Sequence, residues 1–544
     1  QIPAWGGCAG EGKGSEGMDK PEPLMVLSDA LDRITSNGWC PGTHSTRKQA
    51  LNELAGVLKP PKLSIKDCLI RDEGITQISQ AMAVNTVIQK LKLPRTACKD
   101  DGAVEVAAFL SVNQTLRVLD LAGNRIGGEG SKAIAKALKE SNTSLERLDL
   151  QRNELEDGAA AAIGDMLKSN TTLTDLDMNS NPVNKEGWHQ LALTIPDWKG
   201  LKKLQMDGLQ IGDQAATVLS QSLMRNSTID TIHMRFNRLG PEGGTAMAKA
   251  LRVNTTLTTL NLSHNGVLEF GGVEIAEALR VNSTLSRLQL RFNYVKDIGA
   301  VAIGTAITES CNTSLTHLDL GENGLGEHGC CKLLEALDGN TSIQRLFLYR
   351  NNMGDQGALS LGLFLSRDAG VKQLFIDSNG ITALGMRYLR AGLMKNTSLV
   401  ELHMAGNSAE QKGSEEIGLM LTTNTTLEYL QMYDCKIGYK GAIEIAMGIS
   451  VNKTLKYLNL GANDLGDQGA AAMSEGLKRN EHLDIMHLGS NRITVMSVGG
   501  LGDDRMRLSN PMCSHPGVHI RALVALHGVL ECEPGALGTG LEFV

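Results

Sequence analysis

One nine-residue pattern recurs through most of this 544-residue chain at a nearly constant interval. Its clearest copy runs from Leu257 to Asn265 and reads L-x-x-L-x-L-x-x-N, where x is any residue. Alternate side chains of an extended segment point to the same side, so Leu260 and Leu262 would share an interior. The closing asparagine stands where the chain must turn, and its amide can bond backbone groups that the turn leaves unpaired. One copy cannot bury its own apolar side, but a stack of copies can.

Sixteen copies of this frame follow one another in steps of 28 residues, with one step of 29 and one of 30. They begin at Pro60, Ile88, Leu116, Leu145, Leu173, Leu201, Ile229, Leu257, Leu285, Leu315, Ile343, Val371, Leu399, Leu427, Leu455 and Leu483. Asparagine closes twelve copies, Cys68 and Cys435 close two, and Thr96 and Leu209 are departures. Because a single globular core does not produce a constant period over such a length, the pattern predicts a solenoid.

A helical pattern follows each frame, and residues 127–138 are typical of it. Ile134, Ala135 and Leu138 form an apolar stripe at helical spacing, and the small residues around them allow close packing. A helix is wider than the strand spacing of about 4.8 Å, so helices belong on the outer, convex side and strands on the inner, concave side. We therefore predict an α/β solenoid, a horseshoe of about sixteen 28-residue strand–turn–helix repeats with a parallel sheet on its concave face.

The repeat also divides the chain into segments. We expect a flexible leader over residues 1–45, a capping helix over 46–59, the repeat domain over 60–494, and a partly capping or unstructured extension over 495–544. A G-x-G-x-x-G match at residues 12–17 has no strand before it, which favours a leader over a phosphate-binding loop. The repeat that holds Trp188 and Trp198 is irregular. It is either a drifted repeat or a place where curvature changes or two tryptophans make an outer contact.

Composition narrows the class of function. The net charge of -7 and the pI near 6.0 argue against binding of nucleic acid by the whole molecule. Ten scattered cysteines without a C-x-x-C pair indicate a reducing compartment rather than a disulfide framework. Residues 1–20 lack the apolar core of a secretory signal, and no run approaches the ~18 apolar residues of a membrane span. We expect a cytoplasmic protein with no cofactor, no metal and no membrane span.

Eleven N-x-S/T sequons fall at one phase of the repeat, just before the strand. We interpret them as turn residues rather than glycosylation sites. The asparagine would end the preceding helix in a left-handed cap, and the serine or threonine would bond the local backbone.

The full pattern, L-x-x-L-x-L-x-x-N followed by G-A-x-x-I-A-x-A-L-x-x-N-T-S/T, resembles the ribonuclease-inhibitor class of leucine-rich repeats over residues 60–494. Proteins of this class include the C-terminal arms of NOD-like receptors, the Ran GTPase-activating protein and leucine-rich subunits of ciliary axonemes. They share a scaffold rather than an activity. The resemblance implies that another protein binds on the concave face.

The residues of that face follow from arithmetic. With the first residue of each frame as offset 0, offsets 2, 4 and 6 face solvent and offset 7 lies at the rim. The first two repeats are basic there, with Lys62, Lys66, Lys90, Lys92 and Arg95, and the next four are acidic, with Asp120, Asp149, Asp175, Asp177 and Asp207. Repeats seven to fifteen carry arginine, histidine and eight of the 19 aromatic residues of the chain.

Arginine and aromatic side chains supply much of the binding energy at protein interfaces, and arginine binds carboxylate or phosphate through two parallel hydrogen bonds. We therefore predict a partner-binding surface made of His233, Arg235, Phe236, Arg287, Arg291, Phe292, Arg345, Phe347, Tyr349, Arg350, Phe375, Tyr429 and Tyr433. Two alternatives stay open. The phenylalanines of the duplicated Arg-Phe-Asn sequences could tuck into their turns, and the aspartates at offset 4 could simply be solvated.

The leading hypothesis is a non-enzymatic scaffold that binds an acidic or mixed-charge partner protein as a structural or regulatory subunit of a hetero-complex. The family resemblance would place such a complex in the axoneme, that is the cilium, or elsewhere in the cytoskeleton. The alternatives are a GTPase-activating protein of the Ran-activator type and a detached sensor arm of a NOD-like receptor. No catalytic motif of the Ran activator can be matched residue by residue, and no G-x-S-x-G, H-E-x-x-H or complete P-loop is present.

Overall fold

The computed structural model describes residues 62–368 and 370–494 and the backbone of 523–525. It divides into two compact units, Gln1–Leu155 and Glu156–Val544. The expected leader over 1–45, the capping helix over 46–59 and most of the extension over 495–544 lie outside the described residues.

The first unit alternates strands and helices in the predicted order. Its four strands pair in parallel, each with the next along the chain, and equal offsets of neighbouring repeats stand opposite each other. The elements are β1 (Lys62–Ser64), α3 (Arg71–Val84), β2 (Lys90–Lys92), α4 (Asp100–Leu110), β3 (Val118–Asp120), α5 (Gly128–Glu140) and β4 (Arg147–Asp149).

The second unit continues the same alternation through twelve strands of its described repeats. The strands are β5 (Asp175–Asp177), β6 (Lys203–Gln205), β7 (Thr231–His233), β8 (Thr259–Asn261), β9 (Arg287–Gln289), β10 (His317–Asp319), β11 (Arg345–Phe347), β12 (Gln373–Phe375), β13 (Glu401–His403), β14 (Tyr429–Gln431), β15 (Tyr457–Asn459) and β16 (Ile485–His487). All pair in parallel with their sequence neighbours, and a further short strand, β17 (Leu523–Ala525), pairs with β16.

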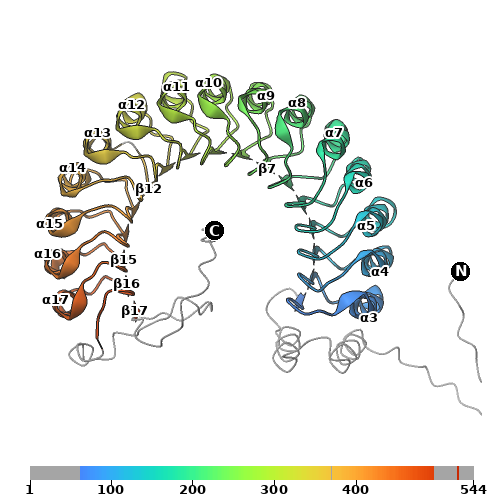
Figure 1. Cartoon of the computed structure of the whole chain (residues 1–544), viewed down its shortest axis with the longest axis horizontal. Coiled ribbons are helices and arrows are strands. Elements are labelled where there is room, and N and C mark those ends of the chain that lie inside the picture. Colours follow the sequence, from blue (N-terminus) through green and yellow to red (C-terminus); the bar gives the residue numbers. More distant parts are fainter. Residues whose placement is uncertain (1–61, 369, 495–522, 526–544) are drawn as a thin grey trace, which may run out of the picture. The chain divides into compact units, whose positions relative to one another are not determined.

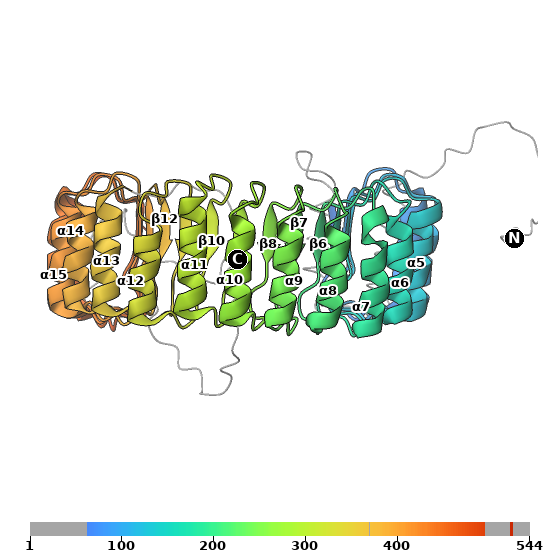
Figure 2. The same cartoon turned by 90° about the horizontal axis from the view of Figure 1, so that it is seen from above.

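The helices of the second unit form one layer on the outer side of its sheet. They are α6 (Asp157–Leu167), α7 (Lys185–Thr194), the 3₁₀ turn η1 (Ile195–Asp197), α8 (Gly212–Leu223), α9 (Pro241–Leu251), α10 (Leu268–Leu279), α11 (Lys296–Glu309), α12 (Gly326–Ala336), α13 (Gly354–Ser366), α14 (Ala383–Leu393), α15 (Glu410–Leu421), α16 (Gly438–Val451) and α17 (Gly466–Lys478). Within this unit the strands follow the inside of an arc and the helices its outside (Figure 1). From above, helices α8 to α12 stand side by side (Figure 2).

The core lies between these two layers and consists of the residues that the frame predicts. In the repeat that starts at Leu257, the leucines at offsets 0, 3 and 5 are buried, and Ile275 and Leu279 of α10 cover them. Offsets 2 and 4 of the same strand lie on the opposite side of the sheet, because side chains alternate along a strand. The prediction of the buried leucines is therefore confirmed, whereas Asn261 at offset 4, a position expected to face solvent, is itself buried.

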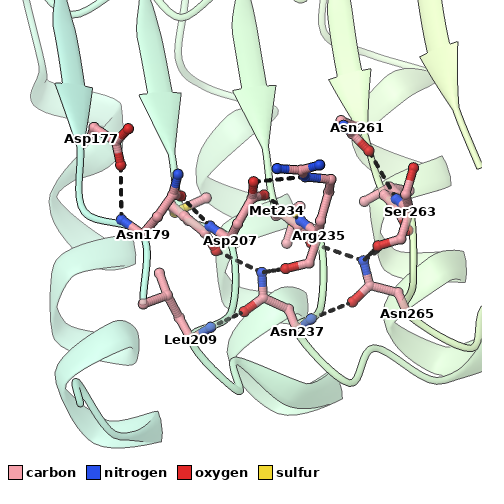
Figure 3. Close-up of polar contacts among 12 residues, drawn as sticks. Asp177, Asn179, Asp207, Leu209, Met234, Arg235, Asn237, Asn261, Ser263 and Asn265 are labelled. Atoms are coloured by element: carbon pink, nitrogen blue, oxygen red, sulfur yellow. Dashed lines mark hydrogen bonds and ion pairs between the residues drawn. The ribbon is translucent and has the colours of Figure 1, made fainter. Parts of the chain in front are cut away.

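The asparagine at offset 8 connects each repeat to the one before it. The side chain of Asn265 is buried, and its Nδ2 donates hydrogen bonds to Met234 O and Leu262 O, both at 2.8 Å. Its Oδ1 accepts from Asn237 N at 2.8 Å and from Leu239 N at 3.3 Å. Figure 3 shows this asparagine ladder, in which Asn237 makes the equivalent bonds one repeat earlier. A buried turn cannot bond water, so the next repeat supplies its partners.

Cys435 and Thr96 replace asparagine at offset 8, and each keeps part of its hydrogen bonding. Cys435 donates its thiol hydrogen to Met404 O at 3.3 Å, and burial raises the pKa of that thiol to about 12, so it keeps the proton. Thr96 Oγ1 donates instead to Leu93 O of its own repeat, at 3.0 Å, and so keeps only the bond within the turn. Leu209 has no polar side-chain atom and is buried in the core instead. The ladder therefore loses its side-chain link at Leu209.

The sequon asparagines form a second ladder at the other end of the strands. Asn254 is buried, its Oδ1 accepts from Thr256 N and Leu257 N, and its Nδ2 donates to Leu223 O. The interpretation as a turn residue is confirmed, and a buried amide with both ends bonded is closed to glycosylation in the fold. The expected left-handed cap is wrong. At Asn452, φ is -69° and ψ is 137°, and this extended backbone lets the side chain accept hydrogen bonds from the amides of Thr454 and Leu455.

The left-handed backbone lies instead in the turn after each strand. Offset 7 has a positive φ in successive repeats, for example at Phe236, His264 and Phe292. The two tryptophans of the irregular repeat, Trp188 and Trp198, are buried, so an outer contact through them is excluded.

Five of the described cysteines are free thiols, namely Cys98, Cys311, Cys330, Cys331 and Cys435. Cys68 is disulfide-bonded, which the scattered cysteine pattern did not predict. Within residues 62–368 and 370–494, no helix is both long and apolar enough to cross a bilayer.

The asparagine ladder gives a test of the fold. Asn293 Oδ1 accepts from Asn265 N and Val267 N, so Asn293→Ala leaves two buried donors without a partner. We expect a loss of about 2–4 kcal/mol in unfolding free energy, because each such donor costs about 1–3 kcal/mol. Urea unfolding measures this loss, and hydrogen exchange should be fastest at the amides of Asn265 and Val267. The control Gln344→Ala removes an exposed amide and should change neither readout; equal stability of the two variants would contradict the role of the ladder.

Candidate protein-binding surface

The predicted site residues all lie on the solvent side of the sheet in the second unit. We call this side, from β7 to β16 with the turns that follow the strands, the inner surface. Offset 2 contributes Arg287, Arg345 and Tyr429, offset 4 contributes His233, Phe347 and Phe375, offset 6 contributes Arg235, Arg291, Tyr349 and Tyr433, and offset 7 contributes Phe236, Phe292 and Arg350. Each of the thirteen is half-buried or exposed, and none belongs to the core.

Six of the rings on this surface form one continuous row, the inner aromatic row, over strands β11 to β16; the first five stack and the last packs at an angle of 51° on its neighbour. Its members are Phe347, Phe375, His403, Tyr429, Tyr457 and His487. Successive ring centres lie 4.2, 4.2, 4.9, 4.0 and 5.2 Å apart. These distances follow the strand spacing of about 4.8 Å, since the strands are in register. Neighbours cover the ring faces, so the edges are left for a partner.

The predicted surface included three members of this row, Phe347, Phe375 and Tyr429, and left out His403, Tyr457 and His487. The missing signal was available, because His403 stands at offset 4 as Phe375 does and the two are opposite each other in the sheet. The row then crosses from offset 4 at His403 to offset 2 at Tyr429. That step depends on the tilt of two side chains and has no counterpart in the sequence pattern.

A second row, the rim row, follows the turns after β7, β8 and β9. Phe236, His264 and Phe292 stack with ring centres 4.2 and 4.8 Å apart, and Tyr294 packs at an angle on Phe292. The side chains of Phe236 and Phe292 remain 51% and 36% exposed. The alternative in which these phenylalanines tuck into their turns is therefore wrong. Their left-handed backbone directs the rings outward along the rim.

Three of the five predicted arginines are already paired within the chain. Arg235 Nε lies 2.8 Å from Asp207 Oδ2, and its backbone N donates to the other oxygen of the same carboxylate. Arg291 and Arg350 share Glu322, with Nη2 of Arg291 at 2.6 Å and Nη1 of Arg350 at 3.5 Å from its Oε1. Such partly exposed pairs contribute little stability, so a partner can exchange them for its own charges. They make this part of the surface mixed in charge rather than basic.

Tyr349 and Asp319 form a buried contact beside these pairs. The Tyr349 hydroxyl lies 3.5 Å from Asp319 Oδ2, its ring packs on Gly321, and the Arg291 guanidinium lies 5.2 Å from the ring centre. Asp319 Oδ1 accepts a hydrogen bond from Gly321 N at 2.9 Å. Burial raises the pKa of Asp319 to about 6, although the hydrogen bond from Gly321, the charge of Arg291 and the Tyr349 hydroxyl each act to lower it. Tyr349 is thus partly structural.

Other aspartates at offset 4 repeat this arrangement. Asp149 and Asp177 are buried, and each accepts a hydrogen bond from the backbone N two residues later. Burial also raises the pKa of Asp149. The interpretation of these aspartates as solvated is wrong, because their carboxylates close the turn after the strand.

The remaining two arginines differ from the others. Arg287 on β9 and Arg345 on β11 are exposed, and they stand opposite His317 on the strand between them. Among residues 62–368 and 370–494, neither forms an ion pair. Burial and the two neighbouring guanidinium groups lower the pKa of His317 to about 4, so its imidazole is neutral at pH 7.

The basic and acidic stretches predicted for the first repeats partly neutralise each other. In the first unit, Arg95 pairs with Asp67, and Lys92 Nζ lies 3.5 Å from Asp120 Oδ2. In the second unit, Lys203 Nζ lies 3.9 Å from Asp175 Oδ2. The pairs join equal or nearby offsets of adjacent repeats, so neither stretch is a field of one sign.

The comparisons with known proteins agree with the repeat architecture. The family model described as leucine-rich repeat matches nine segments, 112–135, 141–164, 169–188, 225–248, 253–274, 281–304, 311–333, 423–446 and 451–474. Together with the parallel sheet and its layer of helices, these matches show that the chain is a leucine-rich-repeat protein, a class of protein-binding scaffolds. The family model does not show which class of leucine-rich repeat this is, so the ribonuclease-inhibitor class stays a prediction from the repeat pattern.

Two further comparisons give no information on the function of the chain. No curated protein matches the chain. Among solved structures it is similar to the "Leiomodin-1 Actin-Binding Site 2 (ABS2)", with 26% identity over 28% of this chain and 77% of that chain. The TM-score is 0.21, so no function is inferred from this likeness.

The buried aspartate gives a test by pH. The pKa of Asp319 in the fold is raised above the ordinary value near 3.9, so its protonated form stabilises the fold at low pH, and this contribution is lost as pH rises through about 6. Asp319→Asn keeps an uncharged side chain at every pH. We expect its unfolding free energy, relative to the unaltered chain, to rise by about 2–3 kcal/mol between pH 4 and pH 8.

Urea unfolding at several pH values measures this difference. The control is Asp484→Asn, which changes an exposed aspartate of the same unit and should give a difference that does not vary with pH. A pH-independent difference for Asp319→Asn as well would show that the carboxyl is not held in its protonated form.

Proposed function

We propose that this chain is a non-enzymatic scaffold that binds another protein on the inner surface of its second unit. The observation that carries the proposal is the pair of aromatic rows on the solvent side of the sheet, with arginines beside them. Arginine, tyrosine and other aromatic residues supply much of the energy at protein interfaces. The helices of the second unit cover the other side of the sheet, so the inner side is the one on which strand residues meet a ligand.

Stacking prepares this surface for binding. A free aromatic side chain loses rotamer freedom when a partner immobilises it, and that loss weakens binding. In the inner aromatic row the four central rings are already held between neighbours, with Tyr429 and Tyr457 parallel to within 3°. Most of the loss of side-chain entropy therefore occurs when the chain folds rather than when a partner binds. The rim row is more exposed and adds contact area at one edge.

The charges of the inner surface favour a partner of acidic or mixed charge. Arg287 and Arg345 offer unpaired guanidinium groups, whereas Arg235, Arg291 and Arg350 lie beside carboxylates. A partner that places carboxylates on the first group and both signs on the second would match the surface. Charge complementarity of this kind sets specificity and the rate of association.

The finer assignments rest on the sequence alone. The scattered cysteines are the ground for a cytoplasmic location, and the repeat resemblance is the ground for a role as a structural or regulatory subunit of a larger hetero-complex, in the axoneme or the cytoskeleton. Stimulation of GTP hydrolysis by a small GTPase would instead identify the Ran-activator alternative, and the purified chain can be assayed for it directly.

The inner surface can be tested by proximity labelling from the full chain in cells. Phe236→Ala together with Tyr433→Ala removes one exposed ring from the rim row and one from the neighbourhood of the inner aromatic row. Rings of this kind are each worth more than about 1 kcal/mol at an interface. We expect the labelling of direct partners to fall at least about tenfold for the double variant.

A matched control exists on the outer side of the same unit. Phe270 on α10 and Tyr439 on α16 are exposed to a similar extent, so Phe270→Ala with Tyr439→Ala removes the same two residue types. Its partners should be labelled as by the unaltered chain. If instead the outer variant loses partners that the inner variant keeps, the helices carry the binding surface and the proposal is wrong.

A further inference from the structure

Two arginines of the inner surface stand out because the chain does not neutralise them. Offset 2 reads Thr259, Arg287, His317, Arg345 and Gln373 on five consecutive strands, so uncharged residues flank the basic group on both sides. On β9, β10 and β11, the positions at offset 4 are occupied by Gln289, Asp319 and Phe347. Every other predicted arginine of the inner surface has a carboxylate within ion-pair distance.

Three acidic groups, on β10, in the turn after β10 and on β13, are engaged elsewhere. Asp319 is buried and bonded to Gly321 N and Tyr349. Glu322 holds Arg291 and Arg350, and Glu401, two strands beyond Arg345, contacts His403 at 2.6 Å. The positive charge at Arg287 and Arg345 is therefore open to a ligand.

The spacing of the two arginines suits a ligand of particular size and charge. In register on β9 and β11, their Cα atoms are separated by two strand spacings, about 9.6 Å. Two long side chains at that distance can converge from opposite sides above the shorter His317. A carboxylate has two oxygens and one charge, which a single guanidinium satisfies. A phosphoryl group has three terminal oxygens and a charge of about -1.5 to -2, which two guanidinium groups can share.

We propose that Arg287, His317 and Arg345 form an oxyanion site that takes the phosphoryl group of a phosphorylated side chain on the partner protein. This inference rests on the proposed function, since it names the chemistry that the inner surface recognises. Arg287 and Arg345 bind the phosphoryl oxygens through paired N–H donors, and the imidazole of His317 forms the floor of the site. Phe347 follows Arg345 by two residues on the same side of β11, so the phosphorylated residue brings its neighbours to the start of the inner aromatic row.

The environment of His317 agrees with this arrangement. Its Nδ1 lies 2.7 Å from Thr316 Oγ1, which fixes the ring between the two arginines. The lowered pKa of the imidazole reflects, after burial, the repulsion from Arg287 and Arg345. The positive potential of the two arginines also attracts a phosphoryl dianion.

Fluorescence polarisation of a labelled peptide tests the site in the full chain. The probe is a pentapeptide with one central phosphoserine between glycines, and matched peptides carry serine or aspartate at that place. We expect the phosphoserine peptide to bind at least about tenfold more tightly than either, because hydrogen bonds between charged groups are the strong ones. Equal binding of the aspartate peptide would overturn the phosphoryl assignment, and so would no binding of the phosphoserine peptide.

Three variants locate the binding. Arg287→Gln with Arg345→Gln should abolish the preference for phosphoserine. Arg287→Lys with Arg345→Lys keeps the charge but loses the two-pronged geometry, and it should retain only part of the preference. Arg225→Gln with Arg238→Gln removes the same charge from exposed positions outside the site and should leave the preference unchanged. An unchanged preference in the first variant, with its thermal unfolding also unchanged, would overturn the inference.

The two proposals fail in different ways. If Phe236→Ala with Tyr433→Ala loses its partners but the phosphoserine peptide does not bind, the scaffold stands and the oxyanion site falls. If that aromatic variant keeps its partners while the peptide binds through Arg287 and Arg345, the site binds phosphoryl groups, but its placement within the proposed protein-binding surface is wrong.

Discussion

The bond from each asparagine to the turn of the preceding repeat is the constraint on which the architecture depends. Its amide both donates to and accepts from the preceding repeat, so a turn of that repeat is complete only when the next repeat is in place. A buried turn without such partners would leave several backbone groups unbonded. The sequon asparagines impose the same condition at the other end of the strand. Adjacent repeats are thus held at a fixed distance and in fixed register within each unit.

Fixed register turns single residues into rows. Equal offsets of neighbouring strands stand opposite each other at about 4.8 Å, which is close to the preferred separation of stacked rings. A ring at offset 4 of one repeat therefore stacks on a ring at offset 4 of the next, as Phe347 does on Phe375. The same geometry places Arg287, His317 and Arg345 together although they lie in three different repeats. Recognition on such a surface is a property of the stack, and no single repeat contains it.

This relation explains what could be predicted from the sequence and what could not. The frame predicts the strands and the buried leucines, because each of these depends on one repeat alone. The errors concern contacts between repeats or turn geometry. The carboxyl of Asp319 meets Tyr349 from the next repeat, Arg291 meets Glu322, and the sequon asparagines fold their side chains onto an extended backbone. None of these follows from the spacing of residue types within one copy. Whether the thirteen predicted residues bind a partner stays a prediction.

The most direct measurement of the central claim is hydroxyl-radical footprinting of the full chain, alone and in complex with a partner captured by it. The proposal predicts that oxidation of Phe236 and Tyr433 falls in the complex while oxidation of Phe270 and Tyr439 does not change. Protection of Phe270 and Tyr439, with Phe236 and Tyr433 oxidised as in the free chain, would contradict it.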